Sequence, residues 1–162
     1  MSTAGASPGW MVVRVGVTRV ALPIEAVGEV LPIPSMAPVP MSPDWVAGIV
    51  SVRGEVVTVI DTARRLLGRS VNSEGRMVLV STGTADERAG LLVDGVVGLV
   101  DRAEGDARPG AGESRDLAPA FVAATVASGR SARIAVLDLA ALLDPAVVSP
   151  GAPAPASGSG SA

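Results

Sequence analysis

The segment GIVSVRGEVVTVID, residues 48–61, decides the fold of this chain. It contains two runs rich in Val, Ile and Thr, residue types that favour β-strands, and these runs are separated by Arg53 and Gly54. A short break between two strand-forming runs predicts a β-hairpin. Gly54 is expected to adopt the positive φ that a tight turn needs, because glycine has no Cβ that would clash there.

The residues that follow this hairpin predict a short helix over 62–67. Asp61 or Thr62 is suited to cap its N-terminus, and Gly68 stands where helices commonly end. Arg64 and Arg65 are expected on the exposed face of this helix, because charged side chains usually remain in water.

Upstream of residue 48, the sequence predicts two more strands that begin at Met11 and join near Gly16. One helical turn is expected at 24–27, and a strand resumes at 27–31. The proline-rich stretch that follows lacks backbone donors for a central strand, so it is expected to form a loop that Trp45 fixes to the core.

Downstream, five more short strands and a final helix are predicted, at 77–81, 89–93, 96–100, 121–127, 133–137 and 139–143. Asp94–Gly95 separates the second and third of these strands and predicts a hairpin between them. The last two strands are expected to form another hairpin around residues 128–131.

This element order predicts a mainly all-β fold of small barrels, in two similar halves along the chain. With 162 residues and 48% hydrophobic residues, the chain is able to bury one compact core. Aromatic residues make up only 2%, so Val, Ala, Leu and Ile must form most of it. We expect a flexible N-terminus at 1–9, a folded domain at 10–144 and a disordered tail at 145–162.

The composition excludes several functional classes. The chain has no His and no Cys, which removes imidazole bases, thiolate nucleophiles and most zinc sites, and no metal or cofactor is expected. The formal net charge is −3 without a basic cluster, which argues against nucleic-acid binding. The most apolar stretch, 90–100, is too short to span a bilayer, and the N-terminus does not read as a secretory signal. A cytoplasmic protein with no direct membrane insertion is therefore expected.

One remote enzymatic alternative rests on Asp61. The apolar strand that ends in Asp-Thr-Ala resembles the active-site turn of retroviral-type aspartic proteases, in which two such carboxylates meet across a dimer and activate water. The competing interpretation is that Asp61 only caps the following helix. The cap is favoured, because no clear glycine-rich flap follows Asp61.

The segment at 48–61 also resembles the signature of the CheW-like domain family, in which an Arg-Gly turn joins two strands and the second ends in Asp. Segments 20–33, 38–50, 89–100 and 132–143 agree in order and spacing. The resemblance implies two five-stranded SH3-like barrels with a shared hydrophobic core. It also implies a non-catalytic adaptor that joins the cytoplasmic tips of chemoreceptors to the regulatory domain of a CheA-type histidine kinase.

Carried over residue by residue, the family's receptor-binding groove maps to Val27, Glu29, Arg53 and Gly54. Val27 would supply an apolar wall for a receptor helix, and the two charges would set its register. Alternatively, Val27 is core, Glu29 is a solvated strand residue, and Arg53 braces a neighbouring loop. The resemblance assigns no kinase-binding residue.

The chain departs from the usual family residues at Val20, Ser51, Thr58, Thr62 and Ala124. These departures leave open a diverged adaptor that binds a receptor or another partner without the kinase and modulates the pathway.

Overall fold

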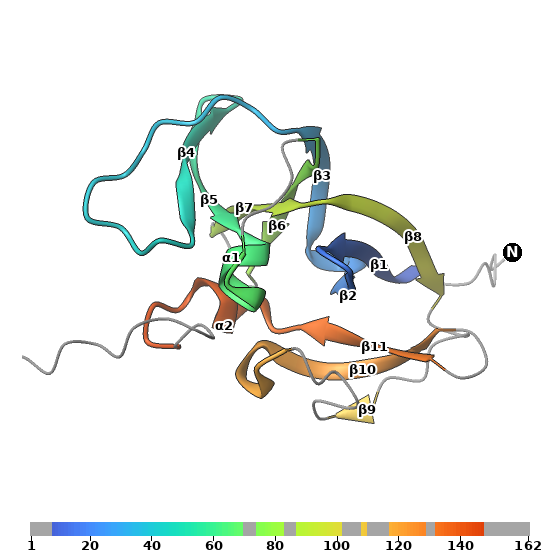
Figure 1. Cartoon of the computed structure of the whole chain (residues 1–162). Coiled ribbons are helices and arrows are strands. Elements are labelled where there is room, and N and C mark those ends of the chain that lie inside the picture. The colour runs from blue at the N-terminus through green and yellow to red at the C-terminus, as the bar shows by residue number, and fades with distance from the viewer. Residues whose placement is uncertain are drawn as a thin grey trace, which may run out of the picture.

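The computed structural model describes residues 8–69, 74–82, 87–101, 108–109, 117–128 and 132–147. Short strands dominate it, and the helices are single turns or little more (Figure 1). The elements are β1 (Pro8–Val15), β2 (Thr18–Pro23), η1 (Ile24–Ala26), β3 (Val27–Pro32), β4 (Val46–Val52), β5 (Glu55–Asp61), α1 (Thr62–Leu67), β6 (Arg76–Ser81), β7 (Arg88–Val93), β8 (Gly95–Asp101), β9 (Arg108–Pro109), η2 (Pro119–Phe121), β10 (Val122–Ser128), β11 (Ala132–Leu137) and α2 (Leu139–Leu143).

The strands form two curled sheets, in agreement with the predicted pair of five-stranded barrels. The first has the order β8-β1-β2-β11-β10, with the two-residue strand β9 added at the edge next to β10, and the second has the order β3-β6-β7-β5-β4. The second barrel is continuous in sequence, whereas the first combines strands from both ends of the chain. The expectation of two halves in sequence order is therefore wrong: one barrel is inserted within the other.

Each barrel contains one parallel strand pair. In the first barrel β2 lies beside β11, with Val20 opposite Ala135, and in the second β5 lies beside β7, with Thr58 opposite Ala89. Both pairs join strands that are distant in sequence, so neither is visible as a local turn motif.

The predicted hairpin at Asp94–Gly95 is also wrong. β7 pairs with β5 and β6 in the second barrel, and β8 pairs with β1 in the first. Asp94 lies at the crossing: its backbone N–H donates to the Arg14 carbonyl at 2.9 Å, and its Oδ2 accepts from the Gly16 N–H at 2.6 Å. The Asp94 side chain thus links the point where the chain passes from the second barrel to the first with the β1–β2 turn. A hairpin would instead have required β7 to pair with β8.

A single apolar cluster joins the two barrels. It includes fully buried residues from the first barrel, such as Val13 and Leu22, and from the second, such as Ile60 and Leu91. Each barrel adds a smaller cluster of its own. The shared core predicted from the family resemblance is therefore present, and aliphatic side chains form most of it.

Helix α1 begins and ends as expected. The Asp61 Oδ1 accepts a hydrogen bond from the Arg64 N–H at 3.0 Å, so Asp61 is the N-cap. Gly68 adopts a left-handed conformation with φ of 72° just after the helix. The same hydrogen bond supports the capping interpretation of Asp61 against the protease alternative.

The expected exposure of Arg65 is wrong, because its side chain is 0% exposed. The guanidinium donates to the carbonyls of Leu142 and Ala141 at 3.0 and 3.1 Å, and to those of Asp144 and Val147 at 2.7 and 2.6 Å. These oxygens lie at the end of α2 and in the turn after it, where a helix leaves carbonyls without intrahelical donors. A buried planar fork is the side chain best suited to satisfy several of them.

Two aromatic rings enclose the same guanidinium. The Arg65 Cζ lies 4.2 Å from the centre of the Trp45 ring and 4.7 Å from that of Phe121. Burial lowers the pKa of Arg65, and the nearby Asp144 carboxylate partly offsets this by favouring the charged form. Trp45 is buried as expected, but its partner is this cation as well as the apolar core.

Residues 8–9 and 145–147, outside the expected folded range of 10–144, are among the described residues. Arg65 donates a hydrogen bond to the Val147 carbonyl, so Val147 contacts the folded domain. The part of the expected 145–162 tail from residue 148 onward lies outside the described residues, as do residues 1–7 and residues 129–131 of the last predicted turn. Neither α1 nor α2 is long enough to cross a bilayer, and the described residues contain no other helix that is.

Candidate functional site

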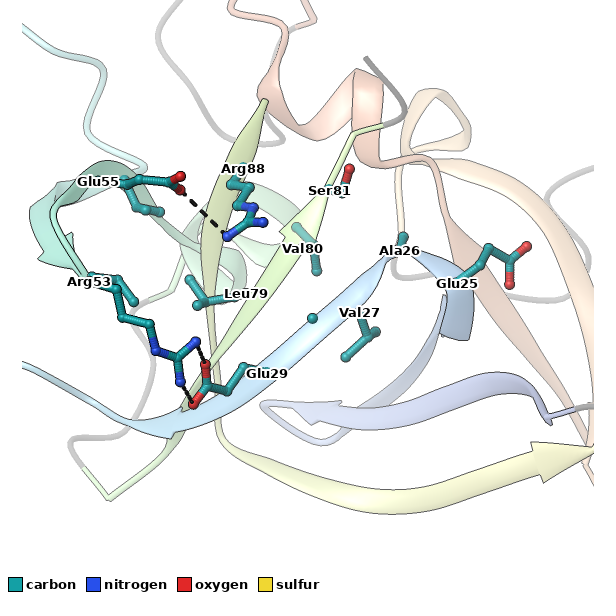
Figure 2. Close-up of a pocket in the computed structure, with 13 residues that line it drawn as sticks. Glu25, Ala26, Val27, Glu29, Arg53, Glu55, Leu79, Val80, Ser81 and Arg88 are labelled. Carbon is teal, nitrogen blue, oxygen red and sulfur yellow. Dashed lines mark hydrogen bonds and ion pairs between the residues drawn. The ribbon is translucent and has the colours of Figure 1, made fainter. Parts of the chain in front are cut away.

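A pocket with a volume of about 420 Å³ lies against the second barrel, between β3 and the tip of the β4–β5 hairpin (Figure 2). Apolar side chains line its interior, and charged side chains from η1, β3, the β4–β5 turn, β5 and β7 stand at its rim. The lining residues are Glu25, Ala26, Val27, Gly28, Glu29, Val52, Arg53, Glu55, Val57, Leu79, Val80, Ser81 and Arg88.

The hairpin turn carries Arg53 to this pocket. Arg53 and Gly54 both have positive φ, 49° and 84°, as in the tight turns that match the twist of a two-stranded ribbon. The turn closes the pair Val52–Glu55, as the sequence predicts. The positive φ of Gly54 is confirmed, whereas the positive φ of Arg53 is an additional finding.

Arg53 forms a two-point ion pair with Glu29 across the pocket mouth (Figure 2). The distances are 2.8 Å from Nη1 to Oε2 and 2.9 Å from Nη2 to Oε1. This parallel geometry is the strongest that Arg and a carboxylate form. The Arg53 side chain is 76% exposed and that of Glu29 is 31% exposed, so the pair faces water and is accessible to a partner.

Val27 forms part of the pocket wall next to this pair. It is partly buried and packs against the shared core, opposite Val80 in the β3–β6 ladder. A β-bulge lies between Val27 and Glu29 in this ladder. Val27 therefore contacts the core, as in the structural interpretation, and also lines the pocket, as in the receptor-binding interpretation.

Three of the four residues carried over from the family thus lie at one pocket. Gly54 does not line it, and its place is in the turn that presents Arg53. The guanidinium of Arg53 pairs with the Glu29 carboxylate of β3, so the partner in the bracing alternative is a strand side chain.

The sequence interpretation missed a second charged pair at the same pocket. Arg88 Nη1 lies 3.5 Å from Glu55 Oε2, and both residues line the pocket wall (Figure 2). Glu55 directly follows the Arg-Gly turn, which is a local signal. Arg88 reaches it only because β7 lies parallel to β5, and no local pattern reveals that pairing.

The described residues contain no group of three acidic residues able to hold a metal ion. Asp61 caps helix α1, and two of the carboxylates that line the pocket, Glu29 and Glu55, pair with arginines. An apolar pocket with charges at its rim is typical of the class of binding modules.

The comparisons with known proteins agree with this class. The model of the CheW-like domain family matches residues 9–147, and the chain belongs to this family of non-catalytic chemotaxis coupling adaptors. A solved structure, the scaffolding protein TtCheW from Thermoanaerobacter tengcongensis, is similar with a TM-score of 0.73 and 25% identity, over 88% of this chain and 97% of that chain.

Two curated relatives support the same assignment. The chemotaxis protein CheW of Rhizobium meliloti is 28% identical over 126 residues, which is 77% of this chain and 81% of that protein. The protein FrzA of Myxococcus xanthus is 36% identical over 86 residues, and the match spans about half of each chain, 53% and 54%. The enzymatic alternative built on Asp61 is therefore wrong.

Proposed function

We propose that this chain joins the cytoplasmic tip of a chemoreceptor to the regulatory domain of a CheA-type histidine kinase. The observation that carries the proposal is the Arg53–Glu29 ion pair at the mouth of a pocket with an apolar wall at Val27. These are the positions at which the family resemblance locates receptor binding.

The pocket chemistry suits a helical partner. A receptor tip is a helical hairpin, and one helix laid over the pocket would cover Val27 with an apolar side chain. Arg53 and Glu29 would then set the register through charge, which contributes more to specificity than to affinity. The edge strand β8 exposes Val96, Val97 and Leu99, which adds apolar surface for a partner to cover.

Coupling requires that the chain hold both partners at once. Two weak contacts on one adaptor strengthen each other, because the first raises the effective concentration for the second. Such assembly takes place in the cytoplasm, at the receptor tips beside the membrane, without insertion of the adaptor into the bilayer.

Co-sedimentation of the purified chain with a receptor signalling fragment, and then with a kinase regulatory domain added, tests this proposal. A ternary complex is the expected result. Binding to the receptor fragment alone would replace the proposal with the diverged adaptor that modulates the pathway without the kinase. Binding to neither would refute both.

Charge reversals test the site itself. Glu29→Arg or Arg53→Glu is expected to weaken receptor binding while leaving the thermal transition nearly unchanged, because exposed ion pairs add little stability. Asp44→Arg is the matched control, since Asp44 forms an exposed ion pair with Arg64 and does not line the pocket. A large loss of stability in Arg53→Glu would instead indicate that Arg53 braces the fold.

A further inference from the structure

The pocket at β3 and the β4–β5 hairpin carries two ion pairs of different strength, and we infer that the weaker one, Glu55–Arg88, determines which receptor helix binds. This inference rests on the proposed function. It assigns a role to two residues that the family resemblance does not mark.

The two pairs differ in geometry. Arg53 and Glu29 satisfy each other through two short contacts of 2.8 and 2.9 Å. Arg88 reaches Glu55 through one nitrogen at 3.5 Å, and these side chains are 60% and 64% exposed. The Glu55–Arg88 pair therefore retains most of its hydrogen-bonding capacity, since Arg has five donors and a carboxylate about four acceptor positions.

A weak exposed pair is easily exchanged for contacts with a partner. Separating Glu55 from Arg88 costs little, because such pairs add almost nothing to stability in water. When a helix covers the pocket and excludes water, an acidic residue near Arg88 and a basic residue near Glu55 would each gain a stronger contact. A helix with the opposite order would place like charges together and would be rejected.

The position of the pair fits this role. Glu55 follows the turn that carries Arg53, and Arg88 begins β7 on the neighbouring strand, so all the rim charges line one pocket. Val57 and Leu79 lie in the apolar lining of the same pocket. The occupant we assign is therefore a receptor-tip helix whose apolar residue enters the pocket, with an acidic neighbour toward Arg88 and a basic neighbour toward Glu55.

The double reversal Glu55→Arg with Arg88→Glu separates recognition from structure. It preserves an ion pair between the same two positions, so the fold loses no contact, but it inverts the charge order that a partner meets. The matched control is the double reversal Asp44→Arg with Arg64→Asp, which inverts an exposed pair of the same 3.5 Å length away from the pocket.

The probe is the purified cytoplasmic signalling fragment of a chemoreceptor from the same organism, with Kd and kon measured at low and high salt. We expect the inverted Glu55–Arg88 pair to bind about tenfold more weakly at low salt, mainly through a lower kon, and high salt to reduce the difference. The control reversal is expected to bind like the native chain. Equal Kd values for the native and the inverted chains would overturn the inference.

Two further outcomes are decisive. Reversing one acidic and one basic residue at the fragment tip is expected to restore binding to the inverted chain, and a loss that no such reversal restores would overturn the inference. If the inverted chain does not fold, Glu55→Gln and Arg88→Gln replace it, and unchanged affinity in both would overturn it as well. A native chain that fails to bind the fragment refutes the proposed function, whereas native binding with no effect of inversion refutes only this inference.

Discussion

Replacing Arg65 by alanine is expected to lower the free energy of unfolding by about 4 kcal/mol. The side chain is fully buried, donates to four backbone carbonyls and lies between the rings of Trp45 and Phe121. Loss of the buried bond to the Leu142 carbonyl costs about 1–3 kcal/mol, and loss of the cation between the rings costs about 1 kcal/mol more. The other three bonds are only part-buried and contribute less each, because the Ala141 and Asp144 carbonyls keep the N–H groups of Asp144 and Val147. Water that enters the vacated space restores part of this, so the effect is smaller than four full penalties.

The same geometry predicts how much stability other variants lose. Arg65→Lys retains the charge but not the planar fork, so it is expected to lose about 2 kcal/mol. Arg64→Ala is the control on the same helix, because Arg64 is partly exposed and its ion pair to Asp44 is 3.5 Å long. That substitution is expected to cost less than about 1 kcal/mol.

Urea unfolding followed by tryptophan fluorescence and by circular dichroism measures these differences. Trp45 contacts the Arg65 guanidinium, so its emission reports directly on this region. For a domain of this size, 4 kcal/mol corresponds to a decrease in Tm of about 12 °C. If Arg65→Ala costs less than about 1 kcal/mol, or no more than Arg64→Ala, then the four carbonyls do not depend on this side chain and the reasoning is refuted.

Three other substitutions test local features by the same unfolding assay. Thr62→Val is expected to raise stability by about 1 kcal/mol, because the Thr62 hydroxyl is buried without a hydrogen-bond partner in the described structure; a loss of stability would contradict this. Gly48→Ala is expected to cost about 2 kcal/mol of stability, since the added Cβ would lie 2.6 Å from the Ala37 carbonyl oxygen. An unchanged unfolding midpoint would show that the backbone around Ala37 moves away at little cost. Asp94→Ala is expected to cost about 1 kcal/mol of stability, because the Gly16 N–H loses its bond to the Asp94 carboxylate. An unchanged stability would show that backbone hydrogen bonds alone hold the segment between β7 and β8 in place.

Local chemistry predicted the elements well. The β4–β5 turn, the Asp61 cap and the Gly68 end of α1 all follow from residues within a few positions of each other. In each case, one glycine or one short polar side chain satisfies a requirement of the neighbouring backbone. Such requirements are visible in a single sequence.

Long-range pairing could not be predicted in this way. Asp94–Gly95 has the composition of a hairpin turn, but β8 gains a better partner in β1, and the chain crosses between barrels instead. Arg65 shows the same limit, because its burial depends on carbonyls almost eighty residues further along the chain. The sequence alone does not reveal that α1 meets the end of α2.

The residues of the candidate site also fall into two groups, those located from the sequence and those found only in the structure. Val27, Glu29 and Arg53 were located by resemblance to a family, and the structure brings them to one pocket. Glu55 and Arg88 join them through the parallel pairing of β5 with β7, which neither composition nor motif spacing indicates. The charge pattern at the rim is therefore a property of the fold rather than of any segment.

The backbone at Arg53 indicates why binding and stability are separable at this site. A φ of 49° costs a residue with a Cβ about 1 kcal/mol, and Asn or Gly would fit this turn position with less strain. The exposed pair with Glu29 adds little stability to offset that cost. The net gain in fold stability from an arginine here is therefore small, whereas an arginine presents a long cation at the pocket mouth. This is why reversal of either charge is expected to act on receptor binding and to leave the thermal transition nearly unchanged.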